Sequence, residues 1–144
     1  MIHKNLTEVA PRSAHELLGG YAILPRTIDK CRAVIASESG EYHFNCPLDK
    51  MLFDFKGTDA ESFKSKTEAG ASDEELLQFI NETGEPKTDE EIAAWTKSAI
   101  DTVYYNDEKK GEWFTGECER LGINPAETTL FQMLDADDAD YFNK

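Results

Sequence analysis

Residues 18–49 read LGGYAILPRTIDKCRAVIASESGEYHFNCPLD, and the rest of the chain is organised around this stretch. Its apolar residues recur at steps of four, three and four, the spacing of one helix face: Leu24, Ile28, Cys31 and Ile35. Pro25 and Pro47 each suit the first turn of a helix, where no backbone N–H is needed. Tyr42–Phe44 could be locally extended, but no second run offers it a hairpin partner. The stretch therefore predicts two helices joined by an irregular connection.

The remainder of the chain carries a series of helix-start signals. A capping box, Ser or Thr followed three residues later by Glu, satisfies two backbone N–H groups at a helix start. It occurs at Ser13/Glu16, Thr58/Glu61, Ser72/Glu75 and Thr88/Glu91. Asn124-Pro125 predicts a further start. The first of these helices would be short, covering about residues 14–18. Two later helices would turn the following residues inward: Ile92, Trp95, Ala99 and Val103 on one, and Trp113, Phe114, Cys118 and Leu121 on the other.

These signals predict an all-α fold with no substantial sheet. We expect a single-domain bundle of about seven or eight short helices covering residues 1–144. A chain of 144 residues has the usual length of one domain and can bury a real core.

The charge of the chain is unusual in size and in distribution. The net charge is −14; residues 1–56 carry seven Lys/Arg and seven Asp/Glu, so residues 57–144, with eight and 22, hold all of it. Such a field repels nucleic-acid phosphates and anionic lipids, so neither nucleic acid nor membrane is an expected partner. Solubility is the simplest explanation for the acidic half.

Targeting and cysteine patterns favour a cytoplasmic protein. The N-terminal residues MIHKNLTEVAPRS contain no apolar run of signal-peptide length, and no later segment approaches a membrane span. Cys31, Cys46 and Cys118 are odd in number and widely spaced, which argues against a disulfide framework. We therefore expect free thiols.

Several motifs are similar to those of a bacterial family known only as a domain of unknown function. The longer ones are LGGYAILPRTIDKCRA at 18–33 and GEYHFNCPLD at 40–49; the shorter ones are PRS at 11–13, GASDEELL at 70–77 and EEIAAW at 90–95. The resemblance runs from about Asn5 to the last helix. It implies a small, mainly helical bacterial protein. The family carries no established activity, so no catalytic residue is transferred.

The residues themselves indicate a small-ligand site near residues 19–49. Gly19-Gly20 could form an anion-binding turn, although a simple helix end followed by a turn also explains the pair. The best candidates for binding a small anionic or polar ligand are Tyr21, Arg26, Lys30, His43 and Cys46. They lie in the neutral half of the chain, where basic groups meet no net opposing charge.

Two other classes of function stay open. An enzyme could use Cys46 as nucleophile and His43 as base, since Cys46 precedes Pro47 at an expected helix N-terminus. Alternatively, the acidic half could dock on a basic protein partner. No metal or cofactor is expected: His43 and Cys46 lack a second ligand pair, and Asp135–Asp140 lacks the Gly and Glu of a calcium loop, which leaves a solvated acidic tail as the simpler interpretation.

Overall fold

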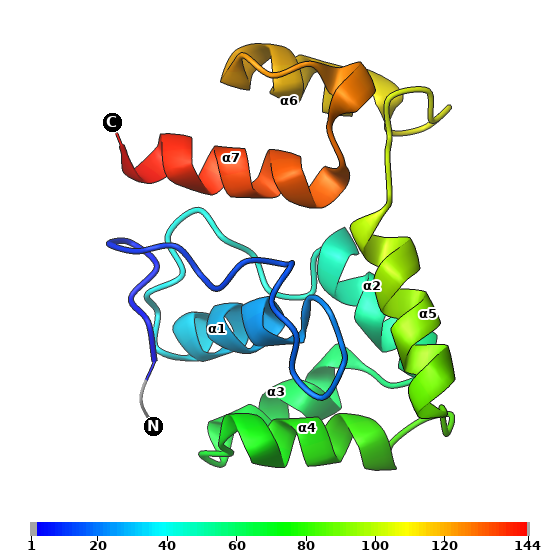
Figure 1. The fold of residues 1–144 in the computed structure, drawn as a ribbon. Helices are drawn as coiled ribbons and strands as arrows, with labels where there is room; N and C mark the ends of the chain where they lie inside the picture. The colour runs from blue at the N-terminus through cyan, green and yellow to red at the C-terminus, as the bar shows by residue number, and fades with distance from the viewer. Residues whose placement is uncertain (1–2, 144) are drawn as a thin grey trace.

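The computed structural model describes residues 3–143 and shows an all-α fold. Seven α-helices and one short 3-10 turn follow one another along this part of the chain (Figure 1): α1 (Leu24–Ile35), α2 (Pro47–Lys56), α3 (Ala60–Glu68), α4 (Asp73–Glu82), α5 (Asp89–Ile100), α6 (Gly111–Leu121), the turn at Pro125–Glu127 and α7 (Leu130–Phe142). The one β-bridge recorded within residues 3–143 joins Leu18 and Tyr21 across the Gly19-Gly20 turn. The predicted fold class is therefore confirmed.

Helix α1 lies at the centre of the fold. In Figure 1, α3 and α4 cover one side of it, α2 and α5 stand at its N-terminal end, and α7 lies across the opposite side, with α6 beyond. Nine of the twelve residues of α1 are buried, including the polar Arg26, Asp29 and Lys30. The predicted apolar stripe faces the core, since Leu24, Ile28 and Cys31 are fully buried.

The core consists of two clusters of buried side chains. One gathers α1, α3 and α4 with part of α2, and includes Leu52, Phe63 and Ile80. The other joins α6 and α7 to the segment before α1 and the start of α2, and includes Ile23 and Phe131. Apolar surface from the C-terminal helices is therefore buried against the N-terminal half of the chain.

Of the five capping signals, two begin an α-helix where the sequence indicates, and three do not. Capping boxes at Ser72/Glu75 and Thr88/Glu91 begin α4 and α5. The capping box predicted at Thr58/Glu61 is wrong, because Asp59 caps α3 by accepting a hydrogen bond from the Ser62 N–H. Asn124 caps only the 3-10 turn, and α7 begins later, with a capping box of Thr129 and Gln132. Gln can replace Glu in this motif.

The expected first helix at residues 14–18 does not form. Instead of capping a helix, the Ser13 hydroxyl donates a hydrogen bond to Asp135 Oδ1 on α7, at 2.7 Å. The Gly19-Gly20 turn follows within a few residues, and both glycines adopt left-handed backbone angles that end a helix. A tertiary contact and an adjacent turn thus override a local start signal.

The acidic segment near the C-terminus is helical and part of it is buried. Asp135–Asp140 belongs to α7, so the expected solvated tail is wrong. Asp138 is 8% exposed and receives two hydrogen bonds from Arg26. The carboxylate is buried because a guanidinium on α1 compensates its charge.

Three residues predicted to face inward are more exposed than expected. Val103 lies beyond the end of α5 and is 51% exposed, and Trp113 on α6 is also 51% exposed. Trp95 is only half-buried, but it contacts both core clusters and stacks on Phe55 with 4.9 Å between ring centroids. Trp95 therefore joins the two clusters at their edge.

Replacing Trp95 by Ala is expected to lower the free energy of unfolding by about 3 kcal/mol, because it removes the ring that both clusters contact. Trp113→Ala is the matched control: its exposed ring should contribute less than about 0.5 kcal/mol. Urea unfolding followed by circular dichroism measures both. Equal losses in the two variants would contradict the assignment of Trp95 as the joining residue.

Candidate functional site

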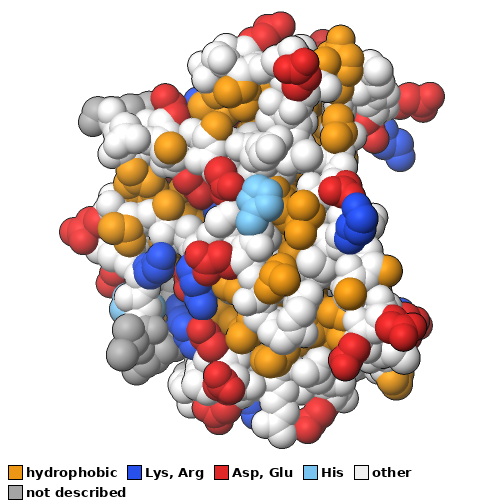
Figure 2. All heavy atoms as spheres, viewed as in Figure 1, with side chains coloured by type: hydrophobic (Ala, Val, Ile, Leu, Met, Phe, Trp, Pro, Cys, Tyr) orange, Lys and Arg blue, Asp and Glu red, His pale blue; other side chains and the backbone are white. Residues whose placement is uncertain are grey.

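The two basic candidates on α1 are already paired with carboxylates. Arg26 donates to Asp138 of α7 at 2.8 and 3.2 Å, and Lys30 lies 3.0 Å from Asp49 of α2. Both cations are buried, as is Asp49. Figure 2 shows the same pattern at the surface, where many of the basic side chains on the visible face lie beside acidic ones. These two cations are therefore part of the framework that holds α1.

Asp138 also accepts a hydrogen bond from the Tyr42 hydroxyl, at 2.8 Å. Burial and the neighbouring Asp138 carboxylate raise the pKa of Tyr42, so the phenol keeps its proton and remains a donor. The Arg26 guanidinium lies 5.5 Å from the centre of the Tyr42 ring. This group of three side chains holds α7 and the loop before α2 to the central helix.

Lys30 and Cys46 are brought together. The Lys30 ammonium donates to Cys46 Sγ at 3.2 Å, and Sγ lies 3.7 Å from Asp49 Oδ2. Asp49 also accepts hydrogen bonds from the Thr27 hydroxyl at 2.6 Å and the Asn45 N–H at 2.9 Å. Cys46 is the N-cap residue of α2, and Pro47 occupies the first turn, as the sequence indicates.

Tyr21 and His43 lie apart from this group. Tyr21 is fully buried in the first core cluster, and its hydroxyl donates to Asn81 at 2.9 Å. His43 is exposed in the loop before α2, and among the described residues no hydrogen bond joins it to Cys46. The structure therefore does not form the Cys46–His43 pair that an enzyme of the expected kind needs. Ligand binding by the five candidates stays a prediction.

The Gly19-Gly20 turn packs on α5. The Thr96 hydroxyl donates to the Gly20 carbonyl at 2.7 Å and accepts from the Ala22 N–H at 3.1 Å. A shallow hollow of about 410 Å³ lies between the turn and α5. These contacts give the turn a structural role.

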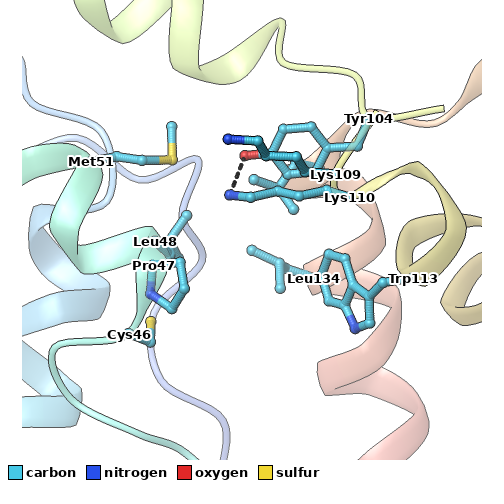
Figure 3. Close-up of a pocket in the computed structure, with 10 residues that line it drawn as sticks. Cys46, Pro47, Leu48, Met51, Tyr104, Lys109, Lys110, Trp113 and Leu134 are labelled. Atoms are coloured by element: carbon cyan, nitrogen blue, oxygen red, sulfur yellow. Dashed lines mark hydrogen bonds between the residues drawn. The ribbon is translucent and has the colours of Figure 1, made fainter. Parts of the chain in front are cut away.

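A more apolar pocket opens between the start of α2 and the C-terminal helices. It has a volume of about 380 Å³, and ten residues line it: Cys46, Pro47, Leu48, Met51, Tyr104, Lys109, Lys110, Trp113, Leu130 and Leu134. In Figure 3, Cys46, Pro47, Leu48 and Met51 form one wall, and Tyr104, Trp113 and Leu134 face them from the other. The two walls come from segments more than 50 residues apart in the sequence.

Two lysines provide the positive charge at this pocket. The ammonium groups of Lys109 and Lys110 lie side by side and point toward the wall that carries Met51 (Figure 3). Lys110 lies 3.4 Å from the Tyr104 hydroxyl and 4.9 Å from the centre of its ring. No carboxylate within residues 3–143 forms an ion pair with either lysine in this structure. The pocket is therefore apolar with a cationic edge.

Of the five ligand-binding candidates named from the sequence, Cys46 alone lines this pocket. The other wall could not be predicted from the sequence, because residues 104–113 carry no motif. The available signal was the adjacent pair Lys109-Lys110, which lies between Tyr105 and Trp113 in a strongly acidic half. An isolated lysine pair in a loop is usually solvated, so the signal is weak.

The comparisons with known proteins define the family. The fold and the pocket define an all-α protein with an apolar pocket edged by lysines. They do not indicate a particular activity. Residues 8–140 match the family model described as a domain of unknown function (DUF5069), and the chain belongs to this family. No curated protein matches the sequence. None of the helices within residues 3–143 is long and apolar enough to cross a lipid bilayer. The expected cytoplasmic location and basic protein partner stay predictions.

Replacing Lys30 by Met is expected to lower the free energy of unfolding by about 3–5 kcal/mol, because it leaves the buried Asp49 carboxylate without its cation. The matched control is Lys97→Met, which removes the exposed partner of Asp101 and should leave the unfolding midpoint unchanged. Chemical denaturation of both variants is the measurement. A Lys30→Met protein as stable as the control would contradict the structural importance of this pair.

Proposed function

We propose that this protein binds a small molecule with an apolar body and an anionic group, in the pocket between α2, α6 and α7. The single observation that carries the proposal is that Lys109 and Lys110 lie at the edge of an otherwise apolar pocket and form no ion pair with a carboxylate within residues 3–143. The proposal keeps the small anionic ligand expected from the sequence. It moves the cationic part of the site from α1 to residues 109 and 110.

The apolar lining supports the first half of the proposal. Pockets of about 300–1,000 Å³ with mainly apolar walls and a few polar groups are typical of small-molecule sites. Leu48, Met51, Leu130 and Leu134 offer aliphatic surface from both walls. An apolar ligand that covers this surface gains about 25 cal/mol for each Å² removed from water.

The lysine pair supports the second half. A chain with a net charge of −14 repels anions at long range, so an anionic ligand needs local positive charge. Lys30 and Arg26 are buried and paired, and cannot supply it without exposing a carboxylate. Lys109 is exposed and Lys110 half-buried, so both can approach a carboxylate or a sulfonate at the mouth of the pocket.

The test compares decanoate with decanol, which share an apolar chain and differ in charge. We expect decanoate to bind about 10- to 100-fold more tightly, because a charge-assisted hydrogen bond contributes roughly 1.5–3 kcal/mol. The double variant Lys109→Ala/Lys110→Ala should remove this difference and leave decanol binding unchanged. Isothermal titration calorimetry gives the affinities, and quenching of the exposed Trp113 reports where the ligand binds.

The control variant is Lys64→Ala/Lys66→Ala, which removes the same charge from α3, away from this pocket. It should bind decanoate as the wild type does. If both double variants weaken decanoate equally, net charge and not the pocket would explain the binding. If decanoate fails to bind the wild type, the proposal is wrong.

A further inference from the structure

The surroundings of Cys46 differ from those of the other two cysteines. Cys31 and Cys118 are fully buried, and burial raises the pKa of the Cys31 thiol to about 11. Burial also raises the pKa of Cys118. Cys46 is half-buried and lines the pocket between α2 and α7. A molecule in that pocket can therefore reach Cys46.

Three neighbours of Cys46 bear on the chemistry of its sulfur. The buried Lys30 ammonium is 3.2 Å from Sγ and faces any negative charge that forms there. The N-terminal end of α2, where Cys46 is the cap residue, attracts negative charge as well. Asp49 Oδ2, 3.7 Å away, is a carboxylate that can accept the thiol proton.

The Asp49 carboxylate would oppose a negative sulfur if it were otherwise uncompensated. It is held by three donors apart from the thiol: the Thr27 hydroxyl, the Asn45 N–H and Lys30. Each donor draws part of its charge, and Lys30, with three N–H bonds, can serve Asp49 and Sγ together. The cluster therefore offers a proton acceptor and a cation to one sulfur.

We infer that Cys46 is a nucleophilic thiol that forms a covalent bond with ligands in this pocket, and that these ligands are α,β-unsaturated carbonyl compounds with an apolar chain. For its choice of ligand this inference rests on the apolar part of the proposed function alone, because the apolar walls would place the chain and an α,β-unsaturated carbonyl group carries no charge. The nucleophile stands on the Lys30–Asp49–Cys46 cluster alone. The cluster replaces His43, which the sequence suggested as base.

The reaction is an addition and needs no oxidant or reductant. The thiol proton passes to Asp49, and the Sγ electron pair forms a bond to the β carbon of the ligand. The π electrons of the carbon–carbon double bond move toward the carbonyl oxygen as an enolate. The α carbon then takes up one proton, which restores the carboxylate of Asp49. The product is a thioether that contains every atom of both reactants.

The first experiment measures the reactivity of Cys46 with a small reagent that has no apolar chain for the pocket to bind. The folded protein and the same chain unfolded in urea are treated with iodoacetamide, and mass spectrometry of peptides gives the rate at each cysteine. We expect Cys46 to react at least tenfold faster in the folded protein, with Cys31 and Cys118 protected. A Cys46 rate at or below that of the unfolded chain would overturn the inference.

Lys30 is expected to affect the reaction only through Cys46 Sγ. Its variants are therefore judged by the reaction rate of Cys46, which a change in stability alone does not alter while the protein stays folded. In folded protein, Lys30→Met should slow the reaction of Cys46 with iodoacetamide at least tenfold, and Lys30→Arg should restore most of the rate. If Lys30→Met does not fold, the rate in Lys30→Arg decides: a rate near that of the unfolded chain overturns the role of the cation.

The second experiment tests the ligand class with nonenal and acrolein, which share the reactive group and differ in chain length. The rate ratio at Cys46 is compared with the ratio for glutathione, which has no pocket. A ratio at least tenfold larger at Cys46 supports the long-chain class, and an equal ratio overturns it. Fast iodoacetamide labelling together with the same nonenal/acrolein rate ratio at Cys46 and in glutathione would show a reactive thiol and overturn the long-chain ligand class. Slow iodoacetamide labelling of Cys46 together with tight decanoate binding would overturn the nucleophilic role of Cys46 and leave the proposed function standing.

Discussion

The buried ion pair between Lys30 and Asp49 is the interaction on which the arrangement of the N-terminal half depends. The two side chains are 3% and 0% exposed and form an ion pair of 3.0 Å, and removing either partner would leave the other uncompensated in the interior. The pair joins α1 to α2, and the same ammonium group contacts Cys46. The Thr27 and Asn45 hydrogen bonds complete the coordination of the carboxylate, so the group is satisfied as a unit.

The same principle explains how α1 can be buried on nearly all sides although it carries several charges. Arg26 meets Asp138 of α7, and Arg32 meets Asp73 of α4, which also binds Arg12. Burial alone would raise the pKa of Asp73, but the hydrogen bonds and charges of Arg12 and Arg32 outweigh it and lower that pKa. Part of the excess negative charge in residues 57–144 is therefore used inside the fold, against cations from the first half.

The pocket lies between the start of α2 and the C-terminal helices. Its walls come from α2 on one side and from α7 and the loop before α6 on the other, and the second core cluster continues beside it. Each wall is anchored separately, α2 by Lys30–Asp49 and α7 by Arg26–Asp138. The space between these walls has Cys46 on one side and two lysines at its edge.

The sequence by itself determined the helical class, the positions of α1, α2, α4 and α5 and the inward stripe of α1, because helical period and capping act between residues three or four apart. It also pointed to Cys46. Only the tertiary structure decided that Ser13 bonds to Asp135 instead of starting a helix, that Asp138 is buried, and that Trp113 faces a pocket. These outcomes depend on contacts between residues as much as 122 positions apart, and no local pattern specifies which carboxylate a buried arginine will meet. The pocket was not predictable for the same reason, since Lys109 and Lys110 come to line the same pocket as Cys46 only after the chain has folded back on itself.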